Sequence, residues 1–451
     1  MLLCTEVWER FSYYGMRALL VLFLTQRVFA GDGWTRVLGA RVVASLFGGA
    51  PTDAATSEER QRQVVRLASR VYGSYTALVY LTPLGGGVLA DRVAGQRRMV
   101  LAGGVLMAAG HAAMTSEAFT FVGLLLIALG NGAFKPNIST QVGRLYVADA
   151  TPVRRDAAFS YFYCGINVGA ALAPLVTGAL AESVGFGAGF AAAGLGMLLG
   201  LAIVVLGARY LPPDATHLSL PKETRPELRT LLLAHRARVL AIVALAALNI
   251  LFWAVYEQQG DSLALFIEDR VARGGVPSSF FQSLNPAFIL LFTPAVSALW
   301  RWQAKRDAEP HAVTKMSIGC ALLALSYVLL ALGSAGGGRT SAGWVVLHLV
   351  VLTLGELYLS PVGLSFVTQA APAELAALLM GVWFLSSFFG NFMAGALGAR
   401  YADMAPAGFW LLCAVLAGVN AAALLLARRP IRAALVAPPH ASGTSAGVIS
   451  S

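Results

Sequence analysis

The chain has 451 residues, 57% of them apolar and 12% charged, and this charged fraction lies far below the roughly 25% of an ordinary soluble domain. The composition excludes a soluble enzyme or binding domain and is typical of a polytopic membrane protein. The net charge of +10 is compatible with nucleic-acid binding, but in a membrane protein an excess of Lys and Arg more often lies in cytoplasmic loops. The first residues, MLLCT, contain no basic segment, so we expect no cleavable signal peptide.

Apolar stretches of about 20 residues, long enough to cross a bilayer as helices, recur along most of the chain. We predict an all-α polytopic membrane protein with twelve spans, six on each side of a polar segment that contains prolines. The first span is interrupted by charges, but its length and its apolar end still fit a span. The spans are 2–30, 71–91, 98–116, 118–139, 156–181, 186–211, 238–268, 278–302, 314–333, 341–370, 375–402 and 407–428.

The spans divide the chain into four parts. Residues 1–211 form an N-terminal six-helix bundle with a periplasmic insertion at 31–70, and residues 238–428 form a C-terminal six-helix bundle. Residues 212–237 link the bundles on the cytoplasmic side, and residues 429–451 are a cytoplasmic tail whose Ser, Gly, Ala and Pro content predicts disorder. In the insertion, apolar residues between Trp34 and Phe47 predict an amphipathic helix on the membrane surface, without a chemical role.

The Lys and Arg residues of the loops predict the orientation. Nineteen of them lie on the side of both termini, and four lie on the opposite side when the first loop is left out. The first loop holds seven Arg, offset by four acids. The positive-inside rule then places both termini in the cytoplasm. The positions of the basic residues therefore indicate the orientation of the chain in the membrane, and we expect no nucleic-acid partner.

The two halves of the chain resemble each other. The fourth span carries LG at 129–130 followed by KP at 135–136, and the tenth carries LG at 354–355 followed by SP at 360–361. Matching breaks in a six-plus-six chain are typical of transporters built from two repeated bundles around a central site.

We take seven charged residues of the predicted spans as the intramembrane set, because an ionisable side chain at the bilayer centre costs about 2.5–3.5 kcal/mol unless it is paired or functional. At about 100° per residue, Glu6, Arg10 and Arg17 lie nearly on one line of the first span, so this stripe must face the protein interior. The seven have a net charge of −1, which one bound proton would neutralise, and this suggests proton coupling. They are Glu6, Glu9, Arg10, Arg17, Lys135, Glu257 and Glu356.

The remaining chemistry-bearing residues are scattered. His111 and His348 are each alone in a span, which favours a structural role. The cysteines also occur singly, without the spacing of a disulfide framework or a metal cluster. No nucleophile, metal or cofactor motif is visible, so we expect no enzyme, no metal and no cofactor. The cysteines are Cys4, Cys164, Cys320 and Cys413.

The loop between the second and third spans is more specific. Residues 87–98 read GVLADRVAGQRR and resemble the loop motif of the major facilitator superfamily, with one residue more than the commonest spacing. An acid at a helix end, facing arginines and a helix dipole, can hold one conformation of a rocking bundle. The motif residues are Gly87, Asp91, Arg92, Arg97 and Arg98.

Further motifs point to one family. Residues 6–11 (EVWERF) match the ExxERF motif on the first helix of the proton-dependent oligopeptide transporter family, and YYG at 13–15 extends the match. The chain resembles this family, within the major facilitator superfamily, over essentially all twelve spans. The other matching segments are 132–137 (GAFKPN), 162–169 (FYCGINVG), 252–258 (FWAVYEQ), Glu356, 360–361 (SP) and 380–384 (MGVWF).

The resemblance implies a fold of two six-helix bundles and proton-coupled symport of di- and tripeptides across the inner membrane by alternating access. Proton coupling is implied for Glu6, Glu9, Arg10 and Glu257. Gating salt bridges are implied for Lys135 with Glu356 and for Arg17 with Glu257. Peptide binding is implied for Tyr13, Tyr14, Arg17, Tyr80, Lys135, Asn167, Asn285, Glu356, Trp383 and Ser387.

The chemistry of these residue types agrees with the implied substrate. Peptide side chains vary, so a site for many peptides should bind the two charged termini and the backbone. Lys135 and Arg17 can hold a carboxylate, and Glu356 can hold an ammonium group. The expected partners are small peptides, protons and the lipid bilayer, and we expect a functional monomer driven by the proton gradient.

Three departures from the family pattern stand out. Animal members carry a proton-linked histidine on the second helix, where this chain has Gly73, as many bacterial members do. The segment 212–238 is too short and polar for the two extra helices that many bacterial members insert. The chain also begins almost at the first motif, so its true start could lie upstream or the first helix could begin here.

Two other functions remain open from the sequence. The same fold could carry another solute with protons, such as nitrate, another anion or an amino-acid derivative. The presence of both Lys135 and Glu356 favours a substrate with both charges. A sensor on a transporter scaffold would usually append a signalling domain, and the tail is too short for one.

Overall fold

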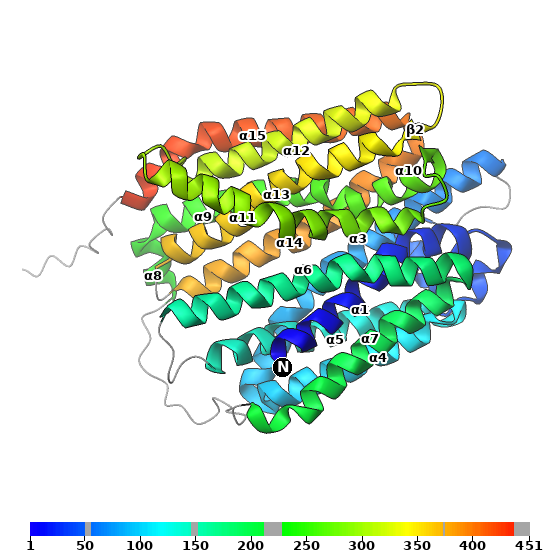
Figure 1. Ribbon diagram of the computed structural model, residues 1–451, viewed down its shortest axis with the longest axis horizontal. Coiled ribbons are helices and arrows are strands. Elements are labelled where there is room, and N and C mark those ends of the chain that lie inside the picture. The colour runs from blue at the N-terminus through cyan, green and yellow to red at the C-terminus, as the bar shows by residue number, and fades with distance from the viewer. Residues whose placement is uncertain (50–55, 146–151, 212–227, 373–374, 437–451) are drawn as a thin grey trace, which may run out of the picture.

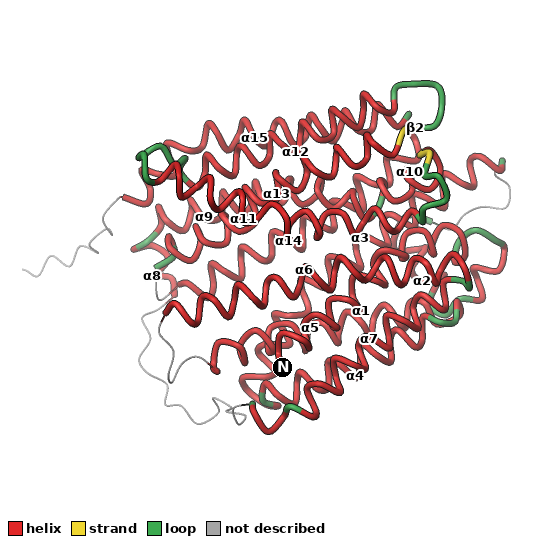
Figure 2. The backbone as a smooth tube through the Cα atoms, viewed as in Figure 1, coloured by secondary structure: helices red, strands yellow, loops and turns green. Residues whose placement is uncertain are grey.

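The structure is a computed structural model that describes residues 1–49, 56–145, 152–211, 228–372 and 375–436. In this part of the chain, long helices run side by side through the molecule (Figure 1), and helices account for nearly all of it (Figure 2). The long helices of the N-terminal half are α1 (Leu2–Phe23), α3 (Ser57–Leu89), α4 (Gln96–Met114), α5 (Thr120–Leu145), α6 (Pro152–Ser183) and α7 (Phe186–Leu206). Those of the C-terminal half are α9 (Arg236–Tyr256), α11 (Leu284–Ala304), α12 (Ala312–Ser334), α13 (Ala342–Ala370), α14 (Ala376–Gly398) and α15 (Pro406–Val436).

The remaining described elements are short. Strands β1 (Val271–Ala272) and β2 (Thr340–Ser341) pair in parallel at the end of the molecule that carries α10. The short helices are α2 (Ala40–Phe47), α8 (Leu228–Ala234) and α10 (Ser262–Arg270).

Each half of the chain has its own hydrophobic core. One core is built from residues between Ala241 and Ile431, and includes the large buried rings of Phe252, Tyr327 and Trp410. Two others are built mainly or entirely from the first 211 residues. Nine helical segments of the described chain are long and apolar enough to cross a membrane. Helices α1, α3 and α4 complete two sets of six, and charged residues within them lower their hydropathy.

Glycines bring equivalent helix pairs close together in the two halves. A Cβ atom on Gly103 of α4 would lie 2.6 Å from the carbonyl oxygen of Gly130 on α5. A Cβ atom on Gly319 of α12 would likewise lie 2.6 Å from the carbonyl oxygen of Gly355 on α13. Small residues allow backbones to approach this closely in a membrane. The LG pairs that match between the fourth and tenth spans therefore mark the same packing position in both halves.

Two predicted spans differ from the structure. The second span was expected at 71–91, but α3 begins at Ser57, so the last part of the predicted insertion continues this helix. Its start is capped by the Thr56 side chain, which accepts a hydrogen bond from the Glu59 amide at 3.3 Å. The seventh span was expected as one helix over 238–268, but α9 ends at Tyr256 and a 3₁₀ turn, Glu257–Gly260, separates it from α10.

The predicted loop and tail segments are partly described. Helix α2 lies within the insertion, and its Leu46 and Val42 side chains are exposed while Ala40 and Ala44 are buried, as the amphipathic pattern predicts. Residues 50–55 of the insertion and 212–227 of the linker lie outside the described residues, and the linker's last part contains α8. The tail was expected to be disordered from residue 429, but α15 continues to Val436. Residues 437–451 lie outside the described part.

Candidate functional site

The charged stripe of α1 faces the interior of the N-terminal bundle. Glu6, Glu9 and Arg10 are all at most 4% exposed. The Arg10 guanidinium is ion-paired with Glu9, donates to its Oε1 at 2.8 Å, and lies 3.3 Å from Glu6 Oε1. The Asn131 amide of α5 also donates to Glu9, at 3.3 Å. The stripe is therefore a buried hydrogen-bonded cluster, as expected for charges on an inward-facing helix surface.

Lys135 of α5 lies near this cluster but forms no ion pair with Glu6 or Glu9. Its Nζ lies 4.9 Å from the centroid of the Tyr80 ring. Two acids and two bases thus give this group a formal charge of zero.

The predicted pair of Lys135 with Glu356 is not formed in this structure. Glu356 of α13 instead accepts hydrogen bonds from the Tyr256 hydroxyl at 2.6 Å and from the Asn285 amide at 2.9 Å. The Asn285 amide also donates to the Thr353 hydroxyl at 3.1 Å. Neutral donors therefore satisfy a carboxylate for which the sequence suggested a cationic partner. A gating bridge between Lys135 and Glu356 remains a prediction.

Arg17 and Glu257 form an ion pair across the two bundles. Arg17 lies on α1, and Glu257 opens the 3₁₀ turn that interrupts the seventh span. Arg17 also donates to the Tyr72 hydroxyl of α3 at 2.8 Å.

A central cavity of about 160 Å³ lies between the bundles. Its wall combines one cation, two acids, several amides and a set of aromatic rings. The predicted site residues among its lining are Tyr14, Arg17, Tyr80, Asn167, Glu257, Asn285 and Glu356. Lining residues that the sequence reasoning did not assign are Tyr163, Ile166, Ala170, Pro174, Trp253, Tyr256, Gln259, Gln282, Pro286, Ile289 and Ser360.

Several of these unassigned residues lie within motifs that the sequence displays. Tyr163 is part of FYCGINVG, and Tyr256 directly precedes Glu257. Tyr256 could have been found, since it lies one residue from an intramembrane acid in a polar run. Gln282 has no comparable signal, because it lies in the turn before α11, where its amide donates to the Ala18 carbonyl of α1 at 3.1 Å.

Four residues predicted to bind peptide lie outside the lining of this cavity. Lys135 lies with the α1 cluster, and Tyr13 is buried 5.2 Å from the Tyr14 ring, centroid to centroid. Trp383 is buried in the C-terminal core, its ring packed against Gly363 of α13. Ser387 is buried on α14 one turn further along. Their contact with a substrate stays a prediction.

The two histidines are buried and bound to their surroundings. His111 Nε2 lies 2.7 Å from the Ser12 hydroxyl of α1, and His348 Nδ1 lies 3.0 Å from the Ser326 carbonyl oxygen. His348 also packs 4.7 Å from the Tyr327 ring, centroid to centroid. Each joins two helices of one bundle, which agrees with a structural role.

The loop motif lies at the end of α3. Gly87 is in the last turns of this helix, and Asp91 follows its end. The Asp91 carboxylate accepts a hydrogen bond from the Gln96 amide at 3.3 Å, and the side chains of Arg92 and Arg98 are exposed. Arg97 is half-buried at the start of α4. The role of this loop as a conformational latch stays a prediction.

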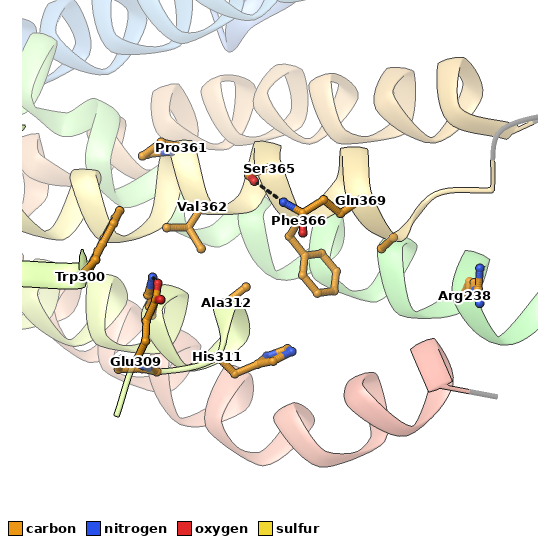
Figure 3. A pocket seen from close by; sticks show the side chains of 13 residues that line it. Arg238, Trp300, Glu309, His311, Ala312, Pro361, Val362, Ser365, Phe366 and Gln369 are labelled. Carbon is orange, nitrogen blue, oxygen red and sulfur yellow. Dashed lines mark hydrogen bonds and ion pairs between the residues drawn. The ribbon is translucent and has the colours of Figure 1, made fainter. Parts of the chain in front are cut away.

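A second cavity of about 600 Å³ lies between α9, α11, α12 and α13, at the end of the molecule that carries α8 (Figure 3). Lys315 is ion-paired there with Glu309, and its Nζ lies 4.1 Å from the centroid of the Trp300 ring. Burial and the nearby Arg432 guanidinium lower the pKa of His311. None of the predicted site residues lines this cavity, so the central cavity is the candidate site.

Among the residues that the structure describes, no group of three or more His, Cys, Asp or Glu side chains could hold a metal ion.

Comparisons with known proteins identify the family. A sequence model of the POT family matches residues 97–215 and 226–410. The peptide transporter YePEPT of Yersinia enterocolitica is 33% identical over 96% of this chain and 93% of its own. The di-/tripeptide transporter of Lactococcus lactis is 30% identical over 95% of this chain and 94% of its own. A crystal structure of the peptide transporter POT in complex with sulfate has a TM-score of 0.81 at 31% identity, over 96% of this chain and 94% of that one.

These similarities confirm the predicted fold class of two six-helix bundles. They also agree with the order of motifs along the chain, from EVWERF on α1 to MGVWF on α14. The chain belongs to the POT family and is a secondary transporter of the major facilitator fold, not an enzyme.

Proposed function

We propose that this protein takes up di- and tripeptides together with protons across the bacterial inner membrane, by alternating access between its two bundles. Both termini lie in the cytoplasm, as the loop charges predict, and the protein works as a monomer without a cofactor. The observation that carries this proposal is the central cavity, because it presents Arg17 and the unpaired acid Glu356 on opposite bundles with amides and aromatic rings between them.

The cavity suits a small zwitterion. Its volume of about 160 Å³ is below the ~300–1,000 Å³ of pockets for drug-sized ligands. Glu356 receives the peptide ammonium group, since it has no cation of its own. Arg17 receives the carboxylate when its bond to Glu257 loosens, and Lys135 adds positive charge from behind the Tyr80 ring.

The other lining residues supply contacts that do not depend on peptide sequence. The amides of Asn167 and Asn285 can hydrogen-bond a peptide backbone, which is the same in every substrate. The rings of Tyr14, Tyr80 and Trp253 form walls that accept side chains of different sizes. Such a site discriminates by length and end groups more than by side chain.

Protons act on the two buried ion-pair systems. Protonation of Glu257 would release Arg17 and separate the bundles at the end where this pair joins them. Protonation of Glu9 or Glu6 would free Arg10 within the N-terminal bundle. Either event biases a two-state equilibrium between conformations. The membrane potential adds about 2.3 kcal/mol per charge per 100 mV.

The test is uptake by the purified protein in liposomes. Labelled dialanine should accumulate when the lumen is alkaline relative to the outside, and a protonophore should abolish the accumulation. N-acetyl-dialanine, which lacks the ammonium group, is the matched control and should not accumulate. Absence of accumulation across a panel of dipeptides would contradict the peptide substrate. Accumulation that persists with the protonophore would contradict proton coupling.

A further inference from the structure

Asp261 is a buried acid that neither the charge pairs nor the central cavity uses. It lies between the 3₁₀ turn Glu257–Gly260 and α10, and its side chain is fully buried. One carboxylate oxygen accepts a hydrogen bond from the Ser69 hydroxyl of α3 at 2.9 Å. The other, Oδ2, is buried and has no hydrogen-bond partner within the described residues.

The neighbouring polar side chain of Gln258 is already engaged. The Gln258 amide nitrogen donates to the carbonyl oxygens of Ala254 at 3.0 Å and Ala394 at 2.9 Å. Its side-chain oxygen accepts from the Ser262 hydroxyl at 2.8 Å. Because both N–H groups of this amide are used, Gln258 cannot satisfy the second oxygen of Asp261.

The charged groups on the surrounding elements are also engaged elsewhere. On α1, Arg17 is paired with Glu257 and bound to the Tyr72 hydroxyl of α3. On α3, Arg66 is paired with Asp403 and Glu59, and Arg70 donates to the Phe47 carbonyl at 2.6 Å. Arg400, beyond the end of α14, is exposed, and Glu268, Asp269 and Arg270 lie at the far end of α10. No cation of the described chain lies within ion-pair distance of Asp261.

The position of Asp261 ties it to the contact between the bundles. Its partner Ser69 lies on α3 of the N-terminal bundle, while its Oδ2 packs against Gly398 on α14 of the C-terminal bundle. Beside it α3 and α14 touch through their backbones: a Cβ atom on Gly73 would lie 2.4 Å from the Gly395 backbone nitrogen. A movement that separates the bundles at this end must therefore expose Asp261 to water.

We propose that Asp261 is a second proton-binding site of the gate that Arg17 and Glu257 close. With the gate closed, a carboxylate here would be buried without a cation, which costs several kcal/mol, so the neutral acid is the form that fits. With the gate open, the side chain reaches water and ionises as an ordinary Asp does. Closing the gate takes up a proton at this site, and opening releases it.

The two acids of the gate then respond to protons in opposite directions. Protonation of Glu257 removes the ion pair that holds the gate closed, whereas protonation of Asp261 removes a buried charge that opposes closure. The proposal rests on the rocking movement of the proposed function, but its test needs no substrate.

The test measures the distance between spin labels on the two bundles at this end of the molecule. Cysteines at Val184 and Gly337, both in exposed loops, carry the labels, and Ser replaces the exposed Cys4 and Cys164. In proteoliposomes at pH 8, Asp261→Asn should raise the ratio of closed to open molecules by roughly tenfold or more over the parent. At pH 5 the difference should be much smaller, because protonating the ionised open state costs less there, and it should disappear below about pH 3.9, the ordinary pKa of Asp. A difference that is absent at pH 8, or equal at both pH values, overturns the proposal.

Two further variants keep the result interpretable. Asp261→Ser removes the acid with a smaller neutral side chain and should give the same pH-dependent difference even if the Asn variant folds poorly. Asp403→Asn removes an acid that is paired with Arg66 across the same interface. It should instead shift the population toward open, by a similar ratio at both pH values. If the Asp261 and Asp403 variants shift the population in the same way, the loss of a negative charge, and not the loss of a proton-binding site, is responsible. Failure of dipeptide uptake would leave this distance measurement unaffected.

Discussion

The acids of the membrane interior fall into two groups. Glu6 and Glu9 on α1 share Arg10, with Lys135 nearby. Glu257 is paired with Arg17, so each acid of the first group has a cation. Glu356 and Asp261 are held by neutral donors only, which are Tyr256, Asn285 and Ser69. Removing one member of the first group leaves a buried charge without its partner. The acids of the second group have no cationic partner among the described residues. They are therefore suited to bind one from outside the protein, either the ammonium group of a substrate or a proton.

The largest loss of stability is expected when Arg10, the cation that Glu6 and Glu9 share, is removed. Arg10→Leu should destabilise the protein by about 3–5 kcal/mol, because it leaves buried carboxylates uncompensated. Thermal unfolding in detergent measures this as a large drop in Tm. Arg36→Leu, at an exposed position, is the matched control. An Arg10 variant that unfolds at the parent's temperature would show that the cluster does not depend on this pairing.

The next largest effect concerns coupling. Glu9→Gln should lower gradient-driven dialanine accumulation at least roughly tenfold, the scale of one bound proton's differential energy. Counterflow exchange without a gradient should persist, because Glu9 does not line the cavity. Glu6→Gln should have a smaller effect, since Glu6 makes one contact of 3.3 Å with Arg10. Unchanged accumulation in Glu9→Gln would remove this residue from the coupling mechanism.

A moderate effect is expected in the second group. Glu356→Gln should change stability by less than about 1 kcal/mol, because an amide can keep the neutral hydrogen bonds. Its affinity for dialanine should fall roughly tenfold to hundredfold, since the ammonium group loses the anionic partner that the proposed function assigns to it. Ligand-induced shifts in Tm measure both. Ser360→Ala serves as the lining control, and N-acetyl-dialanine should bind the parent and the variant equally weakly.

The smallest effect belongs to the exposed ion pair. Arg66 and Asp403 connect the bundles at the surface, where their side chains are 32% and 35% exposed. Asp403→Asn should therefore cost at most about 1 kcal/mol of stability, and high salt should remove the difference between variant and parent. A loss of stability as large as that of Arg10→Leu would mean that solvent exposure does not explain the difference between the buried and the exposed ion pairs.

Most of the spans could be predicted because the bilayer requires long apolar helices, and nine segments of the described chain are apolar enough for hydropathy to indicate them. The early start of α3 could also have been predicted, since Thr56 and Glu59 have the spacing of a helix-capping motif. The break after Tyr256 was missed because hydropathy counts apolar residues and does not register a turn inside a span. Asp261 directly follows that turn, and its side chain is fully buried.

The partners of the buried charges were harder to predict. The pair of Lys135 with Glu356 was implied by the family resemblance. In the structure Glu356 instead accepts hydrogen bonds from Tyr256 and Asn285, because these side chains reach it from α9 and α11. Which donors reach Glu356 depends on how each helix is rotated about its axis and on the turn at 257–260. A pattern of residue types predicts neither of these. Asp261 was overlooked for the same reason, as it resembles an ordinary polar turn residue.

The backbone contact between Gly73 and Gly395 offers a way to control the conformation at this end of the molecule by a single substitution. At this contact the backbones of α3 and α14 meet directly, with glycine on both sides. Adding a single methyl group at either glycine would act as a wedge against the neighbouring backbone. A wedge at this position would hold the transporter open toward one side of the membrane without touching the cavity, and so provide a means of trapping that conformation for study.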